Sequence, residues 1–362
     1  MRLRNSFLIA TQDADSTLRY PGEMENLDSD GRSFTFVELF AGIGGFNLGL
    51  RAAGGINVFA SEWDKFAVST YKNWYPEVPM VTGDVRDLDF ETDIPSHDVL
   101  VGGFPCQPFS LAGVSKKNSL GRPHGFEDRG QGNLFFSIAE IAVAKRPKII
   151  FLENVKNLLS HDGGKTWARI QEIFGQIDYR VTYAVINAKA WVPQSRERVY
   201  IVAFDNHRYK SEKVADFEFP DSKLQQAPVL SSILETEHLE ELELSPKLWE
   251  FLQEYSQKHK SLGNGFGYQI ADKAGVTRTL SARYHKDGSE ILVREDSLER
   301  PRRLSVNEAK RLMGFNAEFE RHLSHDRGFE TVVSKTQAYK QLGNAVVPKV
   351  ILEIAKNFRS YL

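Results

Sequence analysis

The 362-residue chain contains one cysteine, Cys106, and lacks any long hydrophobic segment. A single cysteine excludes an intramolecular disulfide and the zinc and iron–sulfur sites that need several thiolates. No stretch approaches the roughly 20 apolar residues of a membrane span, and the apolar run near the N-terminus is too short for a signal-peptide core. We therefore expect a cytoplasmic protein that has no membrane segment and binds no metal.

The chain also lacks an excess of either charge, since 46 Lys and Arg stand against 48 Asp and Glu. The net charge of -2 excludes an argument for nucleic-acid binding from the charge of the whole chain, although a basic face can still form locally. Hydrophobic residues make up 41% of the sequence and charged residues 26%, which is typical of a soluble globular protein. At about 100–200 residues per domain, the length predicts two domains.

The distribution of apolar residues divides the chain. Residues 1–33 are polar and show no apolar periodicity, so we predict a mobile N-terminal arm. From Phe34 onward, short apolar runs alternate with amphipathic stretches, which predicts a doubly wound α/β domain with a parallel sheet. The alternation stops near Asp205, where a second, smaller domain begins. The predicted strands are residues 34–40, 55–61, 98–103, 148–153, 180–187 and 199–204. The predicted helices are residues 65–74, 134–145, 165–174, 235–244, 247–258 and 346–361, with one more starting at the capping-box pair Ser305 and Glu308.

A glycine-rich turn follows the first predicted strand, in the run AGIGG at residues 41–45. Glycines at such a turn let the backbone approach a ligand, and the helix that follows offers free amides, although a turn used only for packing is an equal alternative. Glu62 ends the next strand and can accept hydrogen bonds from a ribose, while Asp84 follows a further strand and can accept from an adenine amino group. Loop caps are the alternative for each acid. Because the carboxyl ends of parallel strands share one edge, these acids together predict a nucleoside there.

The spacing of the glycines narrows the ligand class. A GxGxxG spacing, which is typical of dinucleotide binding, is missing from the turn. We therefore favour a nucleoside with a short charged tail, such as S-adenosylmethionine, over a nicotinamide dinucleotide.

Cys106 lies between Pro105 and Pro108, directly after the strand predicted at 98–103. A lone cysteine is more often a small buried hydrophobic residue than a reactive one. Here the prolines favour a rigid turn at the same edge of the sheet as the acids, which favours a nucleophile. Glu153 ends the strand predicted at 148–153, where an apolar environment would raise the pKa of its carboxyl and make it a candidate acid.

These residues belong to a longer ordered series. The motifs are FAGIGG at 40–45, PCQ at 105–107, ENV at 153–155, QSRER at 194–198, RLMGF at 311–315 and GNAV at 343–346. The series resembles that of the DNA (cytosine-5) methyltransferases and covers about 330 residues in the family's order. The resemblance implies a Rossmann-like, S-adenosylmethionine-dependent methyltransferase sheet with a smaller, mixed target-recognition domain.

The resemblance also implies roles for individual residues. Cys106 would add to carbon 6 of a flipped cytosine in double-stranded DNA, and Glu153 would protonate or hydrogen-bond ring nitrogen 3, so that carbon 5 can take the methyl group. Arg198 would hold the base and Arg196 would support the catalytic loop. The cofactor would be lined by Phe40, Ala41, Gly42, Gly44, Glu62, Trp63, Asp84, Val85, Asn344 and Val346.

Asn344 has a topological consequence within the same resemblance. Its place in the cofactor site implies that the C-terminal segment returns to the first domain. The expected division is therefore a catalytic domain at 34–204 completed by 335–362, and a target-recognition domain at 205–334.

Two segments are candidates for contact with DNA. A predicted lid at 110–131 is locally basic, and the polar run at 277–288 has few core-forming residues and many donors suited to base edges. The run at 277–288, the stretch at 263–268 and the loop at 110–119 are similar to segments of enterobacterial methylases that modify the inner cytosine of CC(A/T)GG. The predicted DNA-binding residues are Ser110, Lys116, Lys117, Arg122, Arg278, Arg283, Tyr284 and Lys286.

Two alternatives to this function remain at the level of sequence. A transfer-RNA cytosine methylase would use the same motifs, but that family carries a second cysteine in a Cys-Phe-Thr motif and this chain has none. A non-catalytic DNA-binding regulator on the same fold would not need Cys106, Glu153 and Arg198 together. We expect a monomer, because flipping one base requires a single subunit, and a role in restriction–modification.

Overall fold

The computed structural model describes residues 33–105, 134–210, 214, 216–221, 227–237, 240–263 and 267–362. The predicted N-terminal arm, apart from Ser33, lies outside the described residues. So do Cys106 and the predicted lid at 110–131. Within the described part of the chain, no helix is both long enough and apolar enough to cross a bilayer.

A seven-stranded sheet forms the centre of the molecule, with strand order β3-β2-β1-β4-β5-β7-β6. All six strands that the apolar runs predict are present, and a short strand, β3, ends just before Gly83. The strands are β1 (Phe34–Leu39), β2 (Gly55–Glu62), β3 (Met80–Thr82), β4 (Val99–Gly103), β5 (Ile149–Val155), β6 (Tyr179–Asn187) and β7 (Glu197–Asp205).

The prediction of an all-parallel sheet was wrong at one strand, because β7 runs antiparallel to both of its neighbours, β5 and β6. The reason is the length of the connection. Only residues 188–196 lie between β6 and β7, whereas a crossover between parallel strands needs about a dozen residues or more. The remaining pairs in the sheet are parallel.

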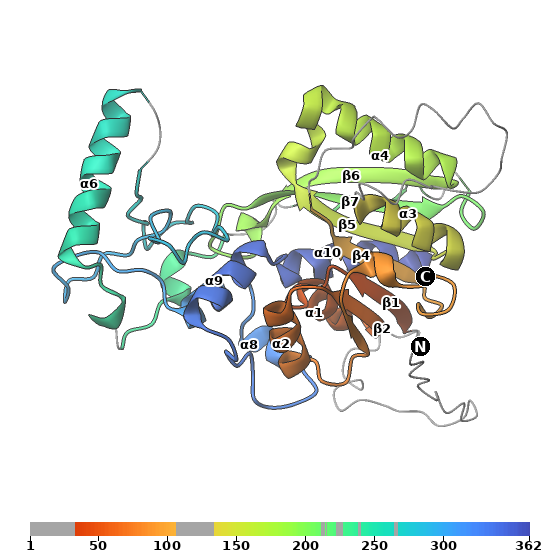
Figure 1. Ribbon diagram of the computed structural model, residues 1–362, viewed down its shortest axis with the longest axis horizontal. Coiled ribbons are helices and arrows are strands. Elements are labelled where there is room, and N and C mark those ends of the chain that lie inside the picture. Colours follow the sequence, from red (N-terminus) through yellow and green to blue (C-terminus); the bar gives the residue numbers. More distant parts are fainter. Residues whose placement is uncertain are drawn as a thin grey trace, which may run out of the picture.

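Helices cover both faces of the sheet, as a doubly wound fold requires (Figure 1). Alternate residues of β1 enter the two cores: Phe36 lies in the core with residues of α1, α2 and α10 on one face, whereas Val37 lies in the core with residues of α3 and α4 on the other. The α-helices of the described residues are α1 (Gly45–Ala52), α2 (Lys65–Trp74), α3 (Leu134–Lys145), α4 (Lys165–Gln176), α6 (Pro246–Ser261), α7 (Val306–Leu312), α8 (Ala317–Glu320), α9 (Lys335–Asn344) and α10 (Pro348–Phe358).

The C-terminal helix α10 lies directly against α1. A Cβ added at Gly49 of α1 would lie 2.6 Å from Cβ of Ile351 in α10, so the two helices touch where glycine leaves room. The last segment of the chain therefore packs on a face of the sheet that begins at Phe34, as the resemblance leads one to expect. The exact domain boundaries at 204 and 335 stay a prediction.

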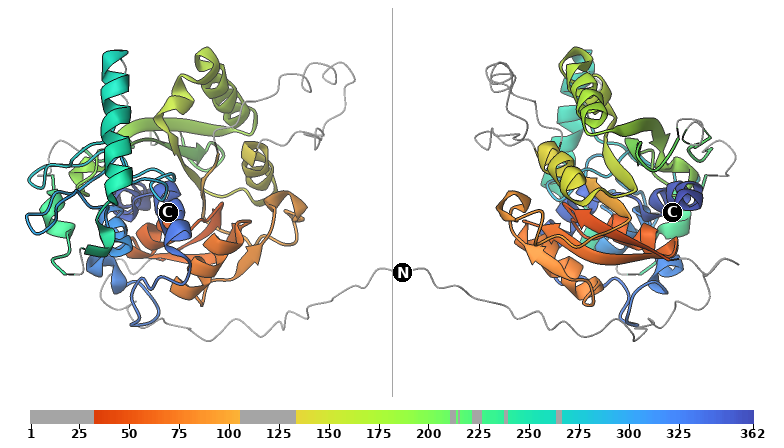
Figure 2. Two further views of the ribbon diagram at one scale, coloured as in Figure 1. Left: turned by 60° about the vertical axis from the view of Figure 1, so that its left-hand side comes forward. Right: turned by 90° about the vertical axis from the view of Figure 1, so that its right-hand side faces the viewer.

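The described residues between β7 and α7 contain little regular structure apart from α6, which projects away from the sheet (Figures 1 and 2). The predicted helix at 247–258 is confirmed by α6, whose N-cap is Ser245. The predicted helix at 235–244 was wrong, since only a 3-10 turn at Glu240–Leu242 forms among its described residues. Acids three and four positions apart repel one another in a helix, and Glu243 instead pairs with Arg300 at 2.9 Å.

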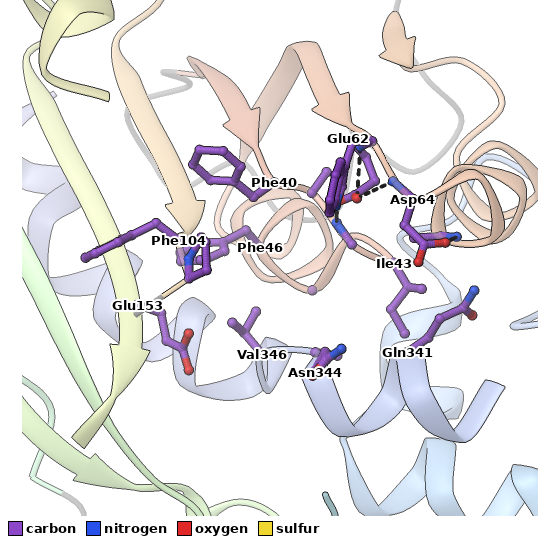
Figure 3. A pocket seen from close by; sticks show the side chains of 18 of the residues that line it. Phe40, Ile43, Phe46, Glu62, Asp64, Phe104, Glu153, Gln341, Asn344 and Val346 are labelled. Atoms are coloured by element: carbon purple, nitrogen blue, oxygen red, sulfur yellow. Dashed lines mark hydrogen bonds between the residues drawn. The ribbon is translucent and has the colours of Figure 1, made fainter. Parts of the chain in front are cut away.

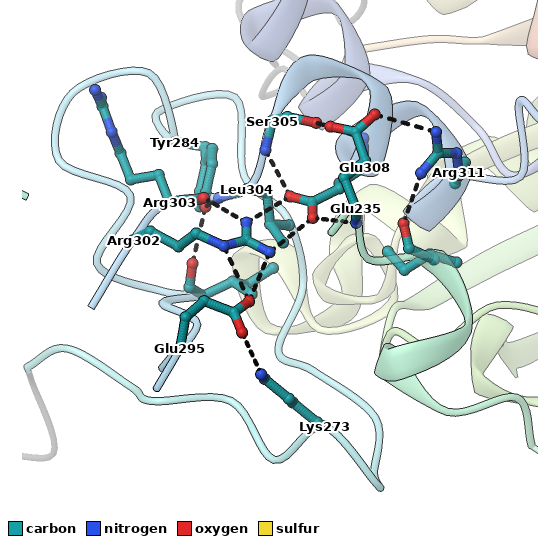
Figure 4. Close-up of polar contacts among 12 residues, drawn as sticks. Glu235, Lys273, Tyr284, Glu295, Arg302, Arg303, Leu304, Ser305, Glu308 and Arg311 are labelled. Carbon is teal, nitrogen blue, oxygen red and sulfur yellow. Dashed lines mark hydrogen bonds and ion pairs between the residues drawn. The ribbon is translucent and has the colours of Figure 1, made fainter. Parts of the chain in front are cut away.

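The start of α7 confirms the predicted capping box. Oγ of Ser305 accepts a hydrogen bond from the Glu308 amide at 3.0 Å, and Oε2 of Glu308 accepts from the Ser305 amide at 2.7 Å. Glu308 also receives two hydrogen bonds from Arg302, whose fully buried side chain reaches Glu295 on its other side (Figure 4). This buried network joins the irregular segment that precedes α7 to that helix.

Candidate active site

A cavity of about 710 Å³ opens at the carboxyl ends of β1, β2, β4 and β5, which is the edge where the sequence predicts a ligand. This volume lies within the range of small-molecule sites, about 300–1,000 Å³. Figure 3 shows Glu62 and Glu153 at opposite ends of the cavity, with Asn344 and Val346 between them. The chain therefore brings residues from both of its ends to one pocket.

The glycines of the turn after β1 differ in their surroundings. Phe40, Gly42 and Gly44 all have left-handed φ angles, of 54°, 56° and 80°. Gly42 lines the cavity and has nothing within 4 Å of the position of a Cβ, so its backbone is open to a ligand. Gly44 does not line the cavity. A Cβ there would lie 2.3 Å from the ring of Tyr75, so packing requires a glycine at this position, and its role as a cofactor residue stays a prediction.

Glu62 anchors the glycine turn from the neighbouring strand. Its Oε2 accepts a hydrogen bond from the Gly42 amide at 2.8 Å, and its Oε1 accepts from the amides of Trp63 and Asp64 at 2.9 and 2.8 Å. Each carboxylate oxygen can accept more than one hydrogen bond, so Glu62 retains capacity for ligand hydroxyls. The side chain of Trp63 is 76% exposed at the wall of the cavity, which leaves its ring free to stack on a ligand.

Asp84 caps the short turn at Val85–Asp87 and also lines the cavity. It accepts hydrogen bonds from the backbone amide of Arg86 at 3.0 Å and from Nε of Arg86 at 2.9 Å. The Arg86 side chain holds the pKa of the Asp84 carboxyl below its usual value. The loop-cap alternative therefore describes one role of Asp84, and its position beside Val85 at the cavity allows a second.

The C-terminal segment closes the cavity. Asn344 at the end of α9 is exposed and lines the pocket with Val346, whose carbonyl oxygen would lie 2.7 Å from a Cβ at Gly45. All of the predicted cofactor residues except Gly44 line the cavity. The prediction missed Lys340, whose Nζ lies 3.2 Å from Oδ2 of Asp64. Its position four residues before Asn344, on the same face of α9, is the signal that could have identified it.

Glu153 lies at the other end of the cavity, where β5 pairs with β4. The strand register places it beside Gly103, two residues before Pro105. Oε1 of Glu153 lies 3.0 Å from Nε of Arg198. Burial raises the pKa of the Glu153 carboxyl, although the positive charges of Arg198 and Arg196 act in the opposite direction. The site therefore combines a carboxyl that tends to keep its proton with an adjacent guanidinium.

Asn154 holds the chain that leads to the cysteine. Its Nδ2 donates a hydrogen bond to the carbonyl oxygen of Phe104 at 2.7 Å, and Phe104 and Pro105 both line the cavity. Cys106 itself lies outside the described residues, as do Ser110, Lys116, Lys117 and Arg122. Their predicted roles stay predictions.

Arg196 is 2% exposed and lines the cavity, yet its hydrogen bonds run to backbone carbonyls of two distant segments. It donates to Leu280 at 3.1 Å, and to Gly343 and Ala345 at 2.9 Å each. Its predicted support of the catalytic loop concerns residues outside the described ones. The bonds to 280 and 343–345 are a role that sequence reasoning missed, because nothing local to the QSRER motif indicates its distant partners.

The predicted DNA-contact residues of the second half separate into two groups. Arg278, Arg283 and Lys286 are exposed, as contact with DNA requires. Tyr284 is fully buried: its hydroxyl donates to the carbonyl of Ile291 at 2.8 Å and accepts from the amide of Leu304 at 2.7 Å. Both hydrogen-bonding capacities are used inside the core, so the prediction of Tyr284 as a DNA contact was wrong.

The sequence and the fold of this chain are similar to those of known proteins. The family description "C-5 cytosine-specific DNA methylase" matches residues 34–360. The chain is 43% identical to a DNA-cytosine methyltransferase of Escherichia coli, over 90% of this chain and 77% of the relative. It is 41% identical to the Type II methyltransferase M.NlaX of Neisseria lactamica, over 91% of this chain and 97% of the relative. A crystal structure of S. pombe Dnmt2 methyltransferase matches with a TM-score of 0.66 at 17% identity, over 91% of this chain and 99% of that one, which shows the fold alone.

The family match covers residues 34–360. This range includes every strand of the sheet and every residue that lines the cavity. The chain belongs to the C-5 cytosine-specific DNA methylase family and is a DNA cytosine-5 methyltransferase.

Proposed function

We propose that this chain transfers a methyl group from S-adenosylmethionine to carbon 5 of a flipped cytosine at a specific site in double-stranded DNA. The observation that carries the proposal is the pair of Glu153 and Arg198, which lies at the end of the cavity where the chain leads to Cys106. A protonated carboxyl and a guanidinium are the groups that can hold the polar edge of a cytosine ring.

The residues of the cavity fit S-adenosylmethionine. The open backbone at Gly42, the spare acceptor capacity of Glu62 and the exposed ring of Trp63 lie together at the end away from Glu153. These groups suit a nucleoside with a charged tail, with the Trp63 ring against the base and Glu62 on the ribose. S-adenosylmethionine, when bound, supplies an electrophilic methyl group.

The chemistry of the protein's own residues follows from an electronic requirement, since carbon 5 of cytosine is a poor nucleophile. The thiolate of Cys106 forms a bond to carbon 6, and Glu153 gives a proton to ring nitrogen 3, which turns carbon 5 into the nucleophilic end of an enamine. Carbon 5 would then take the methyl group of S-adenosylmethionine, with the electron pair of the broken sulfur–methyl bond staying on sulfur, so that S-adenosylhomocysteine leaves. A base removes the proton of carbon 5, the bond between sulfur and carbon 6 breaks, nitrogen 3 returns its proton, and the thiolate is regenerated. Arg198 holds the base beside Glu153 throughout.

Base flipping is part of the proposal, because the cavity lies at the edge of the sheet and a stacked base cannot enter it. For the site, we propose the inner cytosine of CC(A/T)GG, on the similarity of the two predicted DNA segments to the enterobacterial methylases. The relatives named Type II methyltransferases support a role in restriction–modification, and we place that role in the cytoplasm as part of the same proposal.

Covalent trapping tests nucleophile, substrate and site together. The protein is incubated with S-adenosylmethionine and a duplex that carries 5-fluorocytosine at the inner position of CCAGG, because fluorine at carbon 5 blocks the final elimination. We expect a denaturant-stable adduct that is absent with Cys106→Ser and absent on a duplex without the site. An adduct on another sequence would correct only the site. Failure across a duplex library, in protein that binds the cofactor, would contradict the proposal and favour a non-catalytic regulator.

A further inference from the structure

The start of β7 is joined to the polar run at 277–288 by hydrogen bonds in both directions. The Ser195 amide donates to the Thr277 carbonyl at 2.8 Å, and the Thr277 amide donates to the Pro193 carbonyl at 2.9 Å. The Thr279 hydroxyl donates to the Ser195 carbonyl at 2.6 Å. The side chain of Gln194, fully buried, accepts from the Leu280 amide at 2.8 Å. The run proposed to face DNA is therefore fixed to the segment that leads into Arg198.

The same run touches the cofactor side of the cavity. A Cβ added at Gly343 would lie 2.3 Å from the Ala282 amide nitrogen and from the Ser281 carbonyl carbon, so the two backbones are in direct contact. Gly343 precedes Asn344, which faces the cavity. Nothing larger than glycine can stand between the two segments without moving one of them.

Arg196 spans this contact. One nitrogen of its guanidinium donates to Leu280, and the other donates to Gly343 and Ala345, on either side of Asn344. Burial lowers the pKa of Arg196 to about 10, so the group stays charged at neutral pH. Hydrogen bonds from a charged donor are stronger than those between neutral groups, and the planar guanidinium fixes the relative position of its acceptors.

We propose that Arg196 is a positioning residue that couples DNA binding at 277–288 to cofactor binding at Asn344. The inference rests on the proposed function, since it takes the exposed residues of this run as DNA contacts. DNA that orders the run fixes the Leu280 carbonyl, and through Arg196 it fixes the backbone on both sides of Asn344. The coupling is reciprocal, so the cofactor strengthens DNA binding by the same factor as DNA strengthens cofactor binding.

The test measures this factor directly. The affinity for S-adenosylhomocysteine, which has no methyl group to transfer, is determined by calorimetry with and without a saturating duplex that the wild type traps covalently. The ratio of the two dissociation constants is the coupling factor. We expect a factor of about ten for the wild type, within the usual range for allosteric coupling. Arg196→Lys, which keeps the charge but loses the fork geometry, should bring the factor close to one.

Two further variants keep the outcome decisive. Thr279→Val removes the hydrogen bond from the Thr279 hydroxyl to the Ser195 carbonyl and leaves the Arg196 side chain unchanged. It should also lower the coupling factor. This variant therefore tests the coupling if Arg196→Lys does not fold. Arg300→Lys is the matched control, because Arg300 donates to Glu243 and to the Leu244 carbonyl and does not line the cavity. It should keep the wild-type factor.

The outcomes separate the inference from the proposed function. A purely structural role would weaken both affinities and leave their ratio unchanged. A wild-type ratio of one, or a full wild-type ratio in folded Arg196→Lys, would overturn the coupling while methyl transfer stands. Failure of the wild type to trap any duplex would instead overturn the proposed function.

Discussion

Arg198 lies with its Nε 3.0 Å from Oε1 of Glu153, and this direct ion pair is not visible in the local pattern of either motif. Glu153 pairs with Tyr200 across β5 and β7, so Arg198 is its diagonal neighbour, two residues along the antiparallel strand. Burial alone would raise the pKa of the carboxyl, and the arginine limits that rise. Burial and the charge of Arg198 therefore together set the pKa of the Glu153 carboxyl.

Glu153→Gln removes that proton while keeping the shape of the side chain. An amide can still hydrogen-bond ring nitrogen 3 but cannot protonate it, so we expect kcat for methyl transfer to fall by about 10²–10⁴-fold. Affinity for S-adenosylhomocysteine should stay within about twofold, because Glu62, which accepts a hydrogen bond from the Trp63 amide, lies at the other end of the cavity. Glu172→Gln, on the exposed surface of α4, is the matched control. A Glu153→Gln enzyme of wild-type rate would contradict the assigned role.

Arg198→Ala should change the pH dependence of the reaction. The guanidinium lowers the pKa of Glu153, so its removal raises that pKa further. Because the proposed mechanism uses the protonated carboxyl, the rate should fall as pH rises through the pKa of Glu153. The variant should be slower at every pH, with its alkaline limb shifted to higher pH in single-turnover methyl transfer. Arg86→Ala, at the opposite end of the cavity, should leave the position of that limb unchanged.

Glu38 is a buried carboxyl beneath the glycine turn. It accepts a hydrogen bond from the Asn47 amide in the first turn of α1 at 3.2 Å and from the Tyr71 hydroxyl at 2.8 Å. Burial raises its pKa from 4.5 to about 8. Between these values the folded protein holds a proton that the unfolded chain has released, so this group makes stability fall as pH rises through that window.

Glu38→Gln should abolish this contribution. The slope of the unfolding free energy against pH, measured by urea denaturation between pH 4.5 and 8, should differ between the two proteins by up to about 1.4 kcal/mol per pH unit. Stability should fall more steeply with pH in the wild type than in Glu38→Gln. Parallel pH profiles for the two proteins would contradict the buried, protonated state.

Glu308→Ala should lower the free energy of unfolding more than the loss of an exposed ion pair does. Glu308 and Arg302 are both fully buried, and the substitution leaves the Arg302 guanidinium with Glu295 alone and takes away the acceptor of the Ser305 amide; breaking a buried ion pair costs about 3–5 kcal/mol. Urea unfolding should show this loss. Glu241→Ala, which removes the exposed partner of Lys335, should cost less than about 1 kcal/mol. Equal effects of the two substitutions would contradict the importance of the buried network.

The sequence predicted the sheet well because its signals are local. Buried strands show as apolar runs, and acids such as Glu62 and Asp84 show the edge at which those strands end. Residues at the carboxyl ends of neighbouring parallel strands are close in space whatever side chains they contact. Nearly all of the predicted cofactor residues therefore line one cavity. The direction of β7 was also within reach, since the short connection at 188–196 excludes a parallel crossover.

What the sequence could not show depends on contacts between distant segments. Tyr284 lies in a polar run that resembles a DNA-reading segment, yet the amide of Leu304, twenty residues away, directs its hydroxyl inward. Arg302 belongs to a basic cluster and is nevertheless fully buried, because Glu295 and Glu308 neutralise it from both sides. From the local sequence, such residues are expected on the surface. Only their contacts with distant residues show that they are buried.

The reversal of β7 determines which end of that strand meets the active site. In a parallel arrangement the chain would enter β7 at the far edge of the sheet and reach the site with Asp205. Because β7 is antiparallel to β5, its first residues lie at the carboxyl edge, so Arg196 and Arg198 arrive there together with the segment joined to 277–280. The direction of this one strand therefore places residues 277–280 in direct contact with the segment that carries Arg196 and Arg198, the arginines at the proposed site of the base.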